Sequence, residues 1–436
     1  MSLFPKVAKN TIVQILGRAG VIFTTIITTA LLTRLLGTTG YGNYIFVISV
    51  LMFFVTISDW GTSMIFVREA SKIESSQSPL FGGALVIRLV SSLVCLVFIT
   101  LIATIFPLFR PLFIPIEITG LVLILISLKT SLSVVFQTKL RFEFMAMVDV
   151  LISILFLIFL LLVFLFARQL INLSTILMLY FFSNLVGIGL SFFWARELAN
   201  FTYHLDPDLT RKILRESLPT GALLILFSVY NRLDIIILQG MKGPEAVGIY
   251  GLAYKVHDNL ILGAAYLTGA LFPVIAKISV DHTKENPILK EIYRKTFDIL
   301  FIAAVGILLT VIILAPLIIS IIGGPDFSNS VIALRILVFA TFIAYFNHLT
   351  GYTLIALGKQ KVSLSIAIMA LFFNLGANIL LIPNFSYLAA AFNTIATEGL
   401  VFVLTSLYLA KKFDLRPSIT FPKTLIEIFK TKGKIF

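Results

Sequence analysis

The sequence predicts an all-α integral membrane protein with about twelve transmembrane helices in two six-helix bundles. Composition is the first reason: 59% of the 436 residues are hydrophobic and only 13% are charged. Soluble proteins are roughly 45–50% apolar and about 25% charged. The mean hydropathy of +1.04 means that polar residues are too few to cover a folded surface in water. A cytosolic enzyme, an extracellular module, a disordered protein and a nucleic-acid binder are therefore excluded.

The length of the apolar runs is the second reason. About 20 apolar residues cross a bilayer as a helix. Alternation typical of a β-barrel is absent, because runs such as 150–166 are continuous. The first run is too long for a signal peptide and is taken as an uncleaved span. The predicted spans are 11–33, 44–67, 84–106, 116–137, 146–167, 172–193, 218–239, 247–275, 298–322, 331–357, 362–382 and 387–410.

The positions of the basic residues predict the orientation. If both termini are cytoplasmic, 24 of the 34 Lys and Arg residues lie in cytoplasmic segments and four in outer ones. This bias follows the positive-inside rule. The net charge of +13 then faces the cytoplasm and anionic lipid headgroups rather than nucleic acid. We expect a multi-pass protein of the cell (inner) membrane.

The loops argue against built-in catalysis. The outer connections are about 10 residues or shorter, and the cytoplasmic ones contain no phosphate-binding loop or metal pattern. Cys95 is the single cysteine, which excludes an intramolecular disulfide and a cysteine metal site. No enzyme activity, cofactor or metal is predicted.

A repeated pattern is the third reason, and it divides the chain into halves. Gly-x-Tyr follows a glycine turn at 42–44 and again at 248–250, an offset of 206 residues. Both turns lie on the predicted outer side, which indicates a parallel repeat about an axis along the membrane normal. The expected parts are an N-terminal bundle (1–200), a cytoplasmic connection (201–217), a C-terminal bundle (218–410) and a basic cytoplasmic tail (411–436).

Polar residues at membrane depth are the candidate functional residues, because a charge there costs about 2.5–3.5 kcal/mol. Gln14, Arg18 and Thr25 lie on one stripe of the first span. For the threonines of this stripe, hydrogen bonding between helices is an equal alternative. For Arg18 we favour a position facing a cavity.

Further deep polar residues lie in later spans, namely Asp59, Arg88, Asn231, Asp234, Lys255, Asp258 and Glu398. Two interpretations stay open for the charges of the seventh and eighth spans: a neutralised pair inside the bundle, or an anion or proton site lining a path. The spans hold six cations against about four deep acids. A path with a basic excess selects an anionic passenger, and arginine suits phosphate through bidentate contacts.

Several motifs together resemble a known family. They are Gly17-Arg18, the run Thr33 to Tyr44 with its two glycine turns, Asp59-Trp60-Gly61, Asn231-x-x-Asp234 and Val247 to Lys255. They resemble the polysaccharide (O-antigen) flippases of the multidrug/oligosaccharidyl-lipid/polysaccharide (MOP) exporter superfamily.

The resemblance implies a V-shaped MATE-like transporter. Its passenger would be a polyprenyl-diphosphate-linked oligosaccharide, moved to the outer leaflet for surface polysaccharide such as the O-antigen of lipopolysaccharide. Arg18 and Lys255, followed by Arg88, match the cavity residues that bind the diphosphate. The lipid tail would stay in the bilayer, and an H+ or Na+ gradient would drive the alternation of the two halves. Polysaccharide assembly proteins are expected partners.

Three alternatives remain. A cation-coupled drug exporter of the same superfamily would prefer an acidic or aromatic cavity. A peptidoglycan-precursor flippase would carry two further C-terminal spans. A membrane glycosyltransferase or polymerase would need acidic residues in large outer loops.

Overall fold

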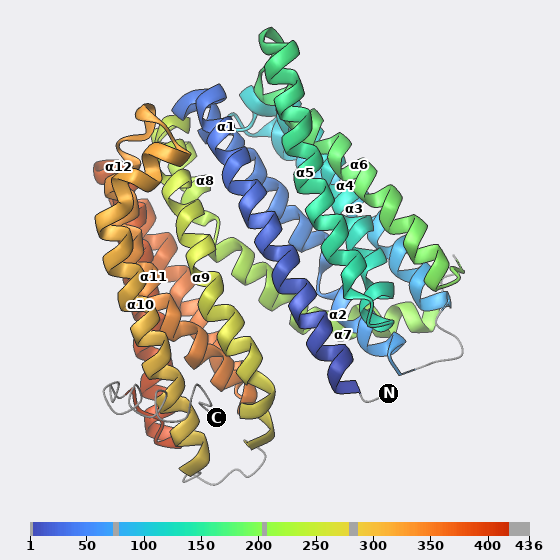
Figure 1. The fold of residues 1–436 in the computed structure, drawn as a ribbon, viewed down its shortest axis with the longest axis vertical. Coiled ribbons are helices and arrows are strands. Elements are labelled where there is room, and N and C mark those ends of the chain that lie inside the picture. The colour runs from blue at the N-terminus through green and yellow to red at the C-terminus, as the bar shows by residue number, and fades with distance from the viewer. Residues whose placement is uncertain (1–2, 73–77, 203–206, 279–286, 418–436) are drawn as a thin grey trace. The chain divides into compact units, whose positions relative to one another are not determined.

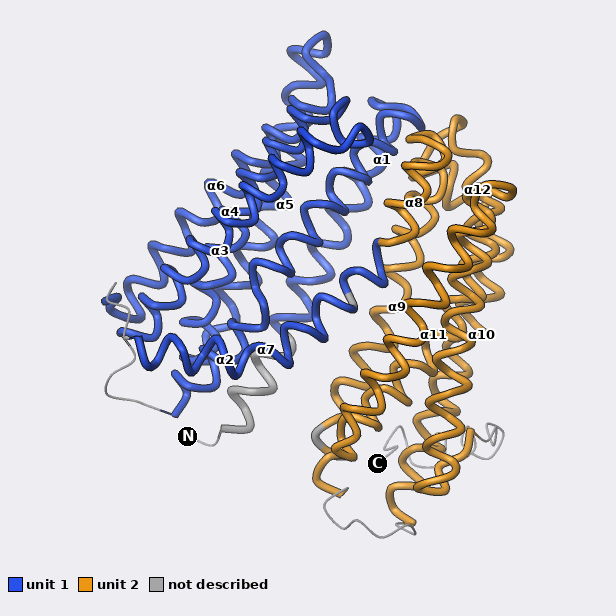
Figure 2. Tube along the Cα trace, turned by 180° about the vertical axis from the view of Figure 1, so that it is seen from behind, with its two compact units in different colours: residues 1–232 blue, residues 233–436 orange. Residues whose placement is uncertain are grey.

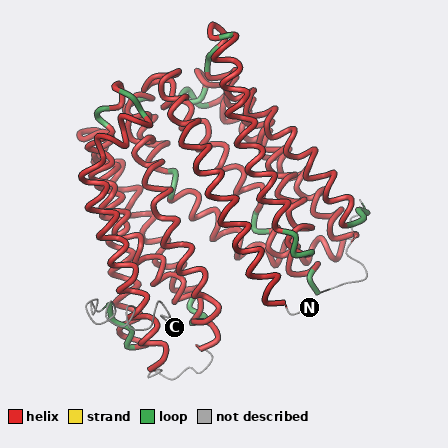
Figure 3. Tube along the Cα trace, in the orientation of Figure 1, coloured by secondary structure: helices red, strands yellow, loops and turns green. Residues whose placement is uncertain are grey.

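The computed structural model describes residues 3–72, 78–202, 207–278 and 287–417. Within these ranges the chain is helical, with loops and no strand (Figures 1 and 3). The α-helices are α1 (Leu3–Asp59), α2 (Thr62–Ala70), α3 (Ser78–Ile105), α4 (Phe113–Thr138), α5 (Phe142–Phe166), α6 (Leu173–Leu198), α7 (Pro207–Tyr230), α8 (Leu233–Lys242), α9 (Pro244–Ile278), α10 (Pro287–Ile322), α11 (Ser330–Ala356) and α12 (Gln360–Phe413).

Two of these helices are long enough to cross a membrane twice. Ten segments of the described chain have the length and hydropathy of a span, and two of them contain 47 and 54 residues. At 1.5 Å per residue each of the two exceeds about 70 Å, more than twice a bilayer core. α1 is kinked at Gly37 (φ 63°) and α12 at Ser386 (φ 53°). These kinks fall between predicted spans, so the prediction of an all-α membrane protein with about twelve spans is confirmed.

Two predicted spans are not continuous. The span 44–67 is broken at Trp60 and Gly61, where α1 ends and α2 begins. The span 218–239 is broken by a turn at Asn231 and Arg232, which separates α7 from α8. Both interruptions lie beside polar residues of the candidate site. Hydropathy could not reveal them, because apolar residues flank each break.

The chain forms two compact units, residues 1–232 and 233–436 (Figure 2). In unit 1, α4 lies centrally and contacts α1, α2, α3, α5 and α6, while α7 packs against α1 and α2. In unit 2, α11 lies against α9, α10 and α12. The predicted domain boundaries, with a cytoplasmic connection at 201–217 and a C-terminal bundle from residue 218, stay a prediction. In the structure, residues 207–217 are helical and pack within unit 1.

The two units share their turns. Gly37 and Gly243 both have positive φ (63° and 81°) and lie 206 residues apart, the offset found in the sequence. Leu140 and Gly358, after α4 and α11, also share a left-handed conformation (φ 54° and 70°). The residue after each turn donates its N–H five residues back, over 2.8 Å in both cases. This geometry closes a helix C-terminus in the same way in each unit.

Each unit has an apolar core near the ends of its helices. In unit 1, Ile213 of α7 is buried with Phe66, Phe81 and Phe136. α7 is thus part of this core rather than a free linker. In unit 2, Leu415 folds back after the end of α12 and is buried in the cluster that contains Tyr293.

Candidate functional site

The break after Asp59 is fixed by close packing against α7. Trp60 and Gly61 both have positive φ (46° and 73°). A Cβ on Gly61 would lie 2.9 Å from the backbone nitrogen of Gly221, and a Cβ on Gly221 would lie 2.6 Å from the carbonyl oxygen of Trp60. Only glycine allows two backbones to approach this closely. The Asp-Trp-Gly motif therefore ends α1 in the interior of unit 1 and leaves the Asp59 side chain there.

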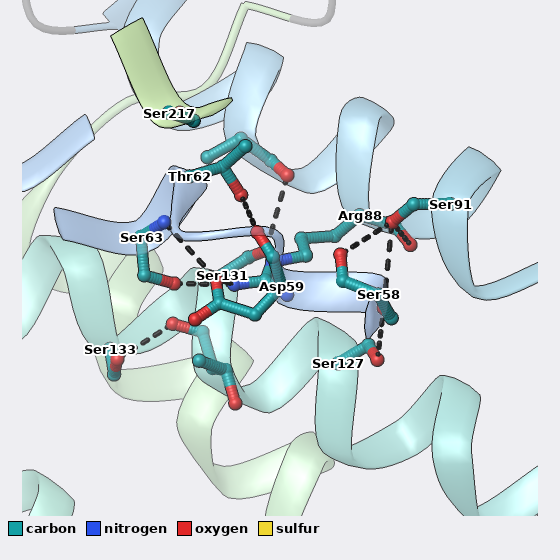
Figure 4. A network of polar contacts seen from close by, with 12 residues as sticks. Ser58, Asp59, Thr62, Ser63, Arg88, Ser91, Ser127, Ser131, Ser133 and Ser217 are labelled. Carbon is teal, nitrogen blue, oxygen red and sulfur yellow. Dashed lines mark hydrogen bonds and ion pairs between the residues drawn. The ribbon is translucent and has the colours of Figure 1, made fainter. Parts of the chain in front are cut away.

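Arg88 of α3 forms an ion pair with Asp59 (Figure 4). Its side chain is only 2% exposed. The same guanidinium nitrogen donates to Ser63 Oγ over 2.5 Å, and Ser63 N donates to Asp59 Oδ1 over 3.2 Å. A charge at this depth requires a counter-charge and hydrogen bonds. The structure thus brings two predicted site residues together and neutralises both.

Serine hydroxyls surround this ion pair and join α1, α3 and α4. Ser58 Oγ lies 2.9 Å from Ser127 Oγ, and Ser91 Oγ donates to the Ser58 carbonyl over 2.9 Å (Figure 4). Ser131 Oγ donates to the Ala84 carbonyl over 3.1 Å. Small polar side chains of this kind allow close helix packing in membranes. These serines were not predicted as site residues. A search for hydroxyls at the depth of Asp59 would have found them.

The polar stripe of α1 lies away from the core of unit 1. The packed face of α1 lies against α5: a Cβ on Gly17 would lie 2.7 Å from Ala146 Cβ, and Thr24 Oγ1 donates to Ser153 Oγ over 2.9 Å. Gln14 and Arg18 are exposed, and Thr25 is half-buried. Among the described residues, Arg18 has no hydrogen bond or ion pair. Arg18 therefore stays a predicted substrate contact.

Lys129 is a second deep cation with a partner in unit 1. Its Nζ lies 2.7 Å from Asp149 Oδ1. Asp149 lies in the predicted fifth span but was not counted among the deep acids. The excess of positive charge within unit 1 is therefore smaller than the sequence indicated.

In unit 2, the predicted Asp234 lies in a buried hydrogen-bonded cluster. It is 3% exposed and accepts a hydrogen bond from the hydroxyl of Tyr250. That hydroxyl lies 3.2 Å from Thr394 Oγ1. The contact joins α8, α9 and α12 through the tyrosine of the repeated Gly-x-Tyr pattern. Asn231, predicted to share a helical face with Asp234, instead lies exposed in the turn between α7 and α8.

The other predicted residues of unit 2 lie on α9 and α12. Lys255 and Asp258 are half-buried on α9. Between them, His257 is buried, with Nδ1 2.7 Å from Thr341 Oγ1. Glu398 accepts a hydrogen bond from the Asn347 amide over 2.6 Å, which connects α12 to α11. Within the described part of the chain, no group of His, Cys, Asp and Glu is arranged to hold a metal ion.

Outside the spans, a charged cluster joins α2 to α7. Glu69 is 8% exposed. It accepts from Lys72 Nζ over 2.8 Å, from Arg68 Nε over 3.0 Å and from Lys212 Nζ over 3.1 Å. The hydrogen bond from Lys72 is the main cause that lowers the pKa of Glu69 to about 2, with Lys212 and Arg68 adding to it and burial opposing it. Glu69 is thus ionised at neutral pH and holds α7 to unit 1.

The fold is similar to that of known membrane transporters. The chain superposes on an inward-facing multidrug resistance MATE family transporter of the MOP superfamily (TM-score 0.72, 15% identity, 89% of this chain and 95% of that one). It also superposes on the lipid II flippase MurJ in an inward closed conformation (TM-score 0.70, 15% identity, 96% of this chain and 93% of that one). At these identities the likeness concerns the fold.

Comparison of the sequence identifies the family of the chain. A family model described as "Polysaccharide biosynthesis protein" matches residues 7–279, and a MatE model matches residues 219–380. The chain belongs to the polysaccharide biosynthesis protein family. It is 26% identical over 219 residues to the capsular polysaccharide biosynthesis protein CapF of Staphylococcus aureus, over 49% of this chain and 54% of that protein. The chain spans about half the length of the curated relatives it matches. It is thus a helical membrane protein of this family, with the same fold as transporters of the MOP superfamily.

Proposed function

We propose that this protein is a flippase that moves a polyprenyl-diphosphate-linked oligosaccharide from the cytoplasmic to the outer leaflet for cell-surface polysaccharide. The family membership, the likeness of fold to MurJ and the relative CapF support this assignment. The observation that carries the site is the exposed Arg18, which has no partner among the described residues.

The proposed substrate contact begins with Arg18. Its guanidinium would bind the diphosphate bidentately, while the polyprenyl chain stays in the bilayer. Lys255 of unit 2 is the second proposed contact. Arg88 becomes a positioning residue in this proposal, because its charge is paired with Asp59 inside unit 1.

The proposal also includes the coupling ion, the membrane location and the partner proteins. Alternating access of the two units would be coupled to H+ or Na+, with Asp234, Asp258 and Glu398 as coupling candidates. The bias of basic residues supports cytoplasmic termini and an inner-membrane location. Assembly proteins of surface polysaccharide would receive the product.

An exporter of organic cations is the second candidate. The MatE match over residues 219–380 favours it, as do the carboxylates of unit 2. Such a protein would transport cations and would not depend on Arg18.

The test is translocation of a fluorescent polyprenyl-diphosphate oligosaccharide in vesicles reconstituted with the full chain. Loss of a charged hydrogen bond costs about 1.5–3 kcal/mol, so we expect Arg18→Gln to slow translocation by about 10- to 100-fold. Arg335→Gln is the matched control, since Arg335 is also an intramembrane cation but binds the carbonyl of Ile312. Equal rates for wild type and Arg18→Gln would contradict the site. Transport of a cationic dye without lipid translocation would favour the exporter.

A further inference from the structure

A pocket of about 440 Å³ lies in unit 2, at the end where α10 begins and α12 ends. It is separate from the residues proposed for transport, and its volume suits a small ligand. Its lining residues are Lys290, Tyr293, Arg294, Asp414, Leu415 and Arg416.

The local sequence builds this pocket from two helix ends. On α10, Lys290, Tyr293 and Arg294 share one face because they are spaced three and four residues apart. α12 ends at Phe413, and Asp414 caps it with φ 53° and donates its N–H to the Ala410 carbonyl over 3.1 Å. Leu415 then donates back to the Leu409 carbonyl and is 1% exposed in the apolar core. This buried leucine holds the residues on either side of it at the pocket.

The charge of the pocket is positive. It has three cations against the one carboxylate of Asp414. Lys290 Nζ lies 2.7 Å from Asp414 Oδ2, and Arg416 Nε lies 3.2 Å from Asp414 Oδ1. These contacts, with the hydrogen bond from Lys290 first, lower the pKa of Asp414. The carboxylate therefore stays ionised, and two positive charges remain in excess. The ends of α10 and α12 contribute macrodipole charges of opposite sign, so the side chains determine the field.

Two buried donors of the pocket residues have no partner. The hydroxyl of Tyr293, whose side chain is 1% exposed, has no hydrogen-bond partner within the described chain, and neither does Nε of Arg294. A buried polar group without a partner costs about 1–3 kcal/mol. Two such groups on one turn of helix, beside a net positive charge, are explained by an acceptor that is anionic.

We propose that this pocket binds a phosphate group, with the Tyr293 hydroxyl and the Arg294 guanidinium as donors and Lys290 and Arg416 as surrounding charge. Phosphate fits because it offers several oxygens to donors converging from different directions. A phospholipid headgroup and a soluble phosphorylated compound carry the same chemistry. The site does not depend on the proposed transport function.

The experiment measures thermal unfolding of the full chain in dodecyl maltoside micelles, which contain no phosphate, against rising inorganic phosphate at constant ionic strength. Binding to the folded state raises the unfolding temperature. We expect wild type to be stabilised and Tyr293→Phe to bind phosphate about tenfold more weakly. Arg294→Gln should lose more, because its hydrogen bond is charged. Lys411→Gln is the matched control, since it removes a charge at the same helix end but does not line the pocket.

A second arm distinguishes the sources. If a lipid headgroup occupies the site, nanodiscs containing phosphatidylglycerol should raise the unfolding temperature of wild type and abolish its further rise with inorganic phosphate. The increase in unfolding temperature caused by this lipid should be smaller in Tyr293→Phe. If a soluble compound occupies it, the phosphate response should persist in those nanodiscs. No stabilisation by inorganic phosphate or by phosphatidylglycerol, or an unchanged response in Tyr293→Phe, would overturn the proposal. That variant deletes one oxygen atom, so it decides the matter if Arg294→Gln does not fold.

Discussion

The two units share a helical plan but fill their interiors differently. Both reverse the chain at glycines 206 residues apart, and both close their central helices with the same left-handed turn. The interior of unit 1 contains a buried ion pair, Arg88 with Asp59. The interior of unit 2 contains hydrogen bonds of a tyrosine and of amides, such as Asn378 Nδ2 to Asn374 Oδ1 over 2.9 Å.

This difference shows that the turns and small residues define the repeated fold, while the buried polar groups are particular to each unit. A buried charge depends on its partner, because removal of one member leaves an uncompensated charge. A neutral hydrogen bond has a smaller cost of loss. The units should therefore respond differently to matched substitutions.

The largest effect is expected for Asp59→Asn. Asparagine keeps the acceptor for Ser63 N but removes the counter-charge of Arg88, which should destabilise the protein by about 3–5 kcal/mol. The measurement is the free energy of unfolding of the purified chain in mixed micelles. Glu398→Gln in unit 2 is the control and should cost less, because Asn347 keeps an oxygen acceptor.

A double variant sharpens this comparison. Asp59→Asn with Arg88→Gln should recover most of the lost stability, because a neutral pair replaces the unpaired cation. If the double variant is less stable than Asp59→Asn alone, the ion pair is not the reason for the loss.

Glycine substitutions form the second comparison. Gly61→Ala introduces a Cβ at positive φ and 2.9 Å from the Gly221 nitrogen, so we expect a loss of about 2–4 kcal/mol. Gly243→Ala in unit 2 has positive φ but no atom within 4 Å of its Cβ, and should lose only about 1 kcal/mol. Equal losses in thermal unfolding would show that backbone strain alone matters at Gly61.

The hydrogen bond between Tyr250 and Asp234 in unit 2 gives a third prediction. Tyr250→Phe removes the donor to Asp234 and should cost about 1–3 kcal/mol in the free energy of unfolding. Tyr266→Phe, on the same helix and 45% exposed, is the control and should be neutral. If Tyr250→Phe destabilised the protein as much as Asp59→Asn does, the proposed energetic difference between the interiors of unit 1 and unit 2 would be wrong.

The smallest effect concerns pH and the charged cluster of α2 and α7. The pKa of Glu69 is lowered to about 2 in the folded protein, from about 4.3 in an unfolded chain. Its contribution is therefore complete above about pH 4.3 and is lost as the pH falls towards 2. Because its cationic partners are about half exposed, we expect about 1 kcal/mol.

The measurement is hydrogen exchange of α7 as a function of pH. Exchange should rise in this acid range for wild type and should be raised at neutral pH in Glu69→Gln. In unit 2, Asp414→Asn should change exchange less, since Asp414 is 52% exposed. Exchange of α7 that does not differ between wild type and Glu69→Gln would contradict the role of the cluster.

Hydropathy and charge predicted most of the fold, because each span must satisfy its own backbone and bury apolar side chains in lipid. The reversals near Gly37 and Ser386 fall in the predicted gaps. The breaks at Gly61 and Asn231 were not predicted, because they depend on helix packing and lie within apolar runs.

The candidate site could be predicted only as separate residues. Asp59 and Arg88 were predicted as site residues because a charge inside a membrane costs free energy. Their positions in the sequence, 29 residues apart, did not indicate that they form an ion pair. The polar stripe of the first span could be predicted from the sequence because helical periodicity is local, and Arg18 stays a prediction. The face of α1 that packs against α5 could not be predicted in this way, because it depends on contacts between helices distant in sequence.

The sequence by itself determined that this chain spans a membrane with two related helical units, because the hydrophobic effect and the positive-inside bias act on composition and order along the chain. Only the tertiary structure decided which buried charges are paired, such as Arg88 with Asp59. That outcome depends on contacts between helices that are not consecutive in sequence, such as α1 with α3 and α8 with α12, and their geometry is set by close packing.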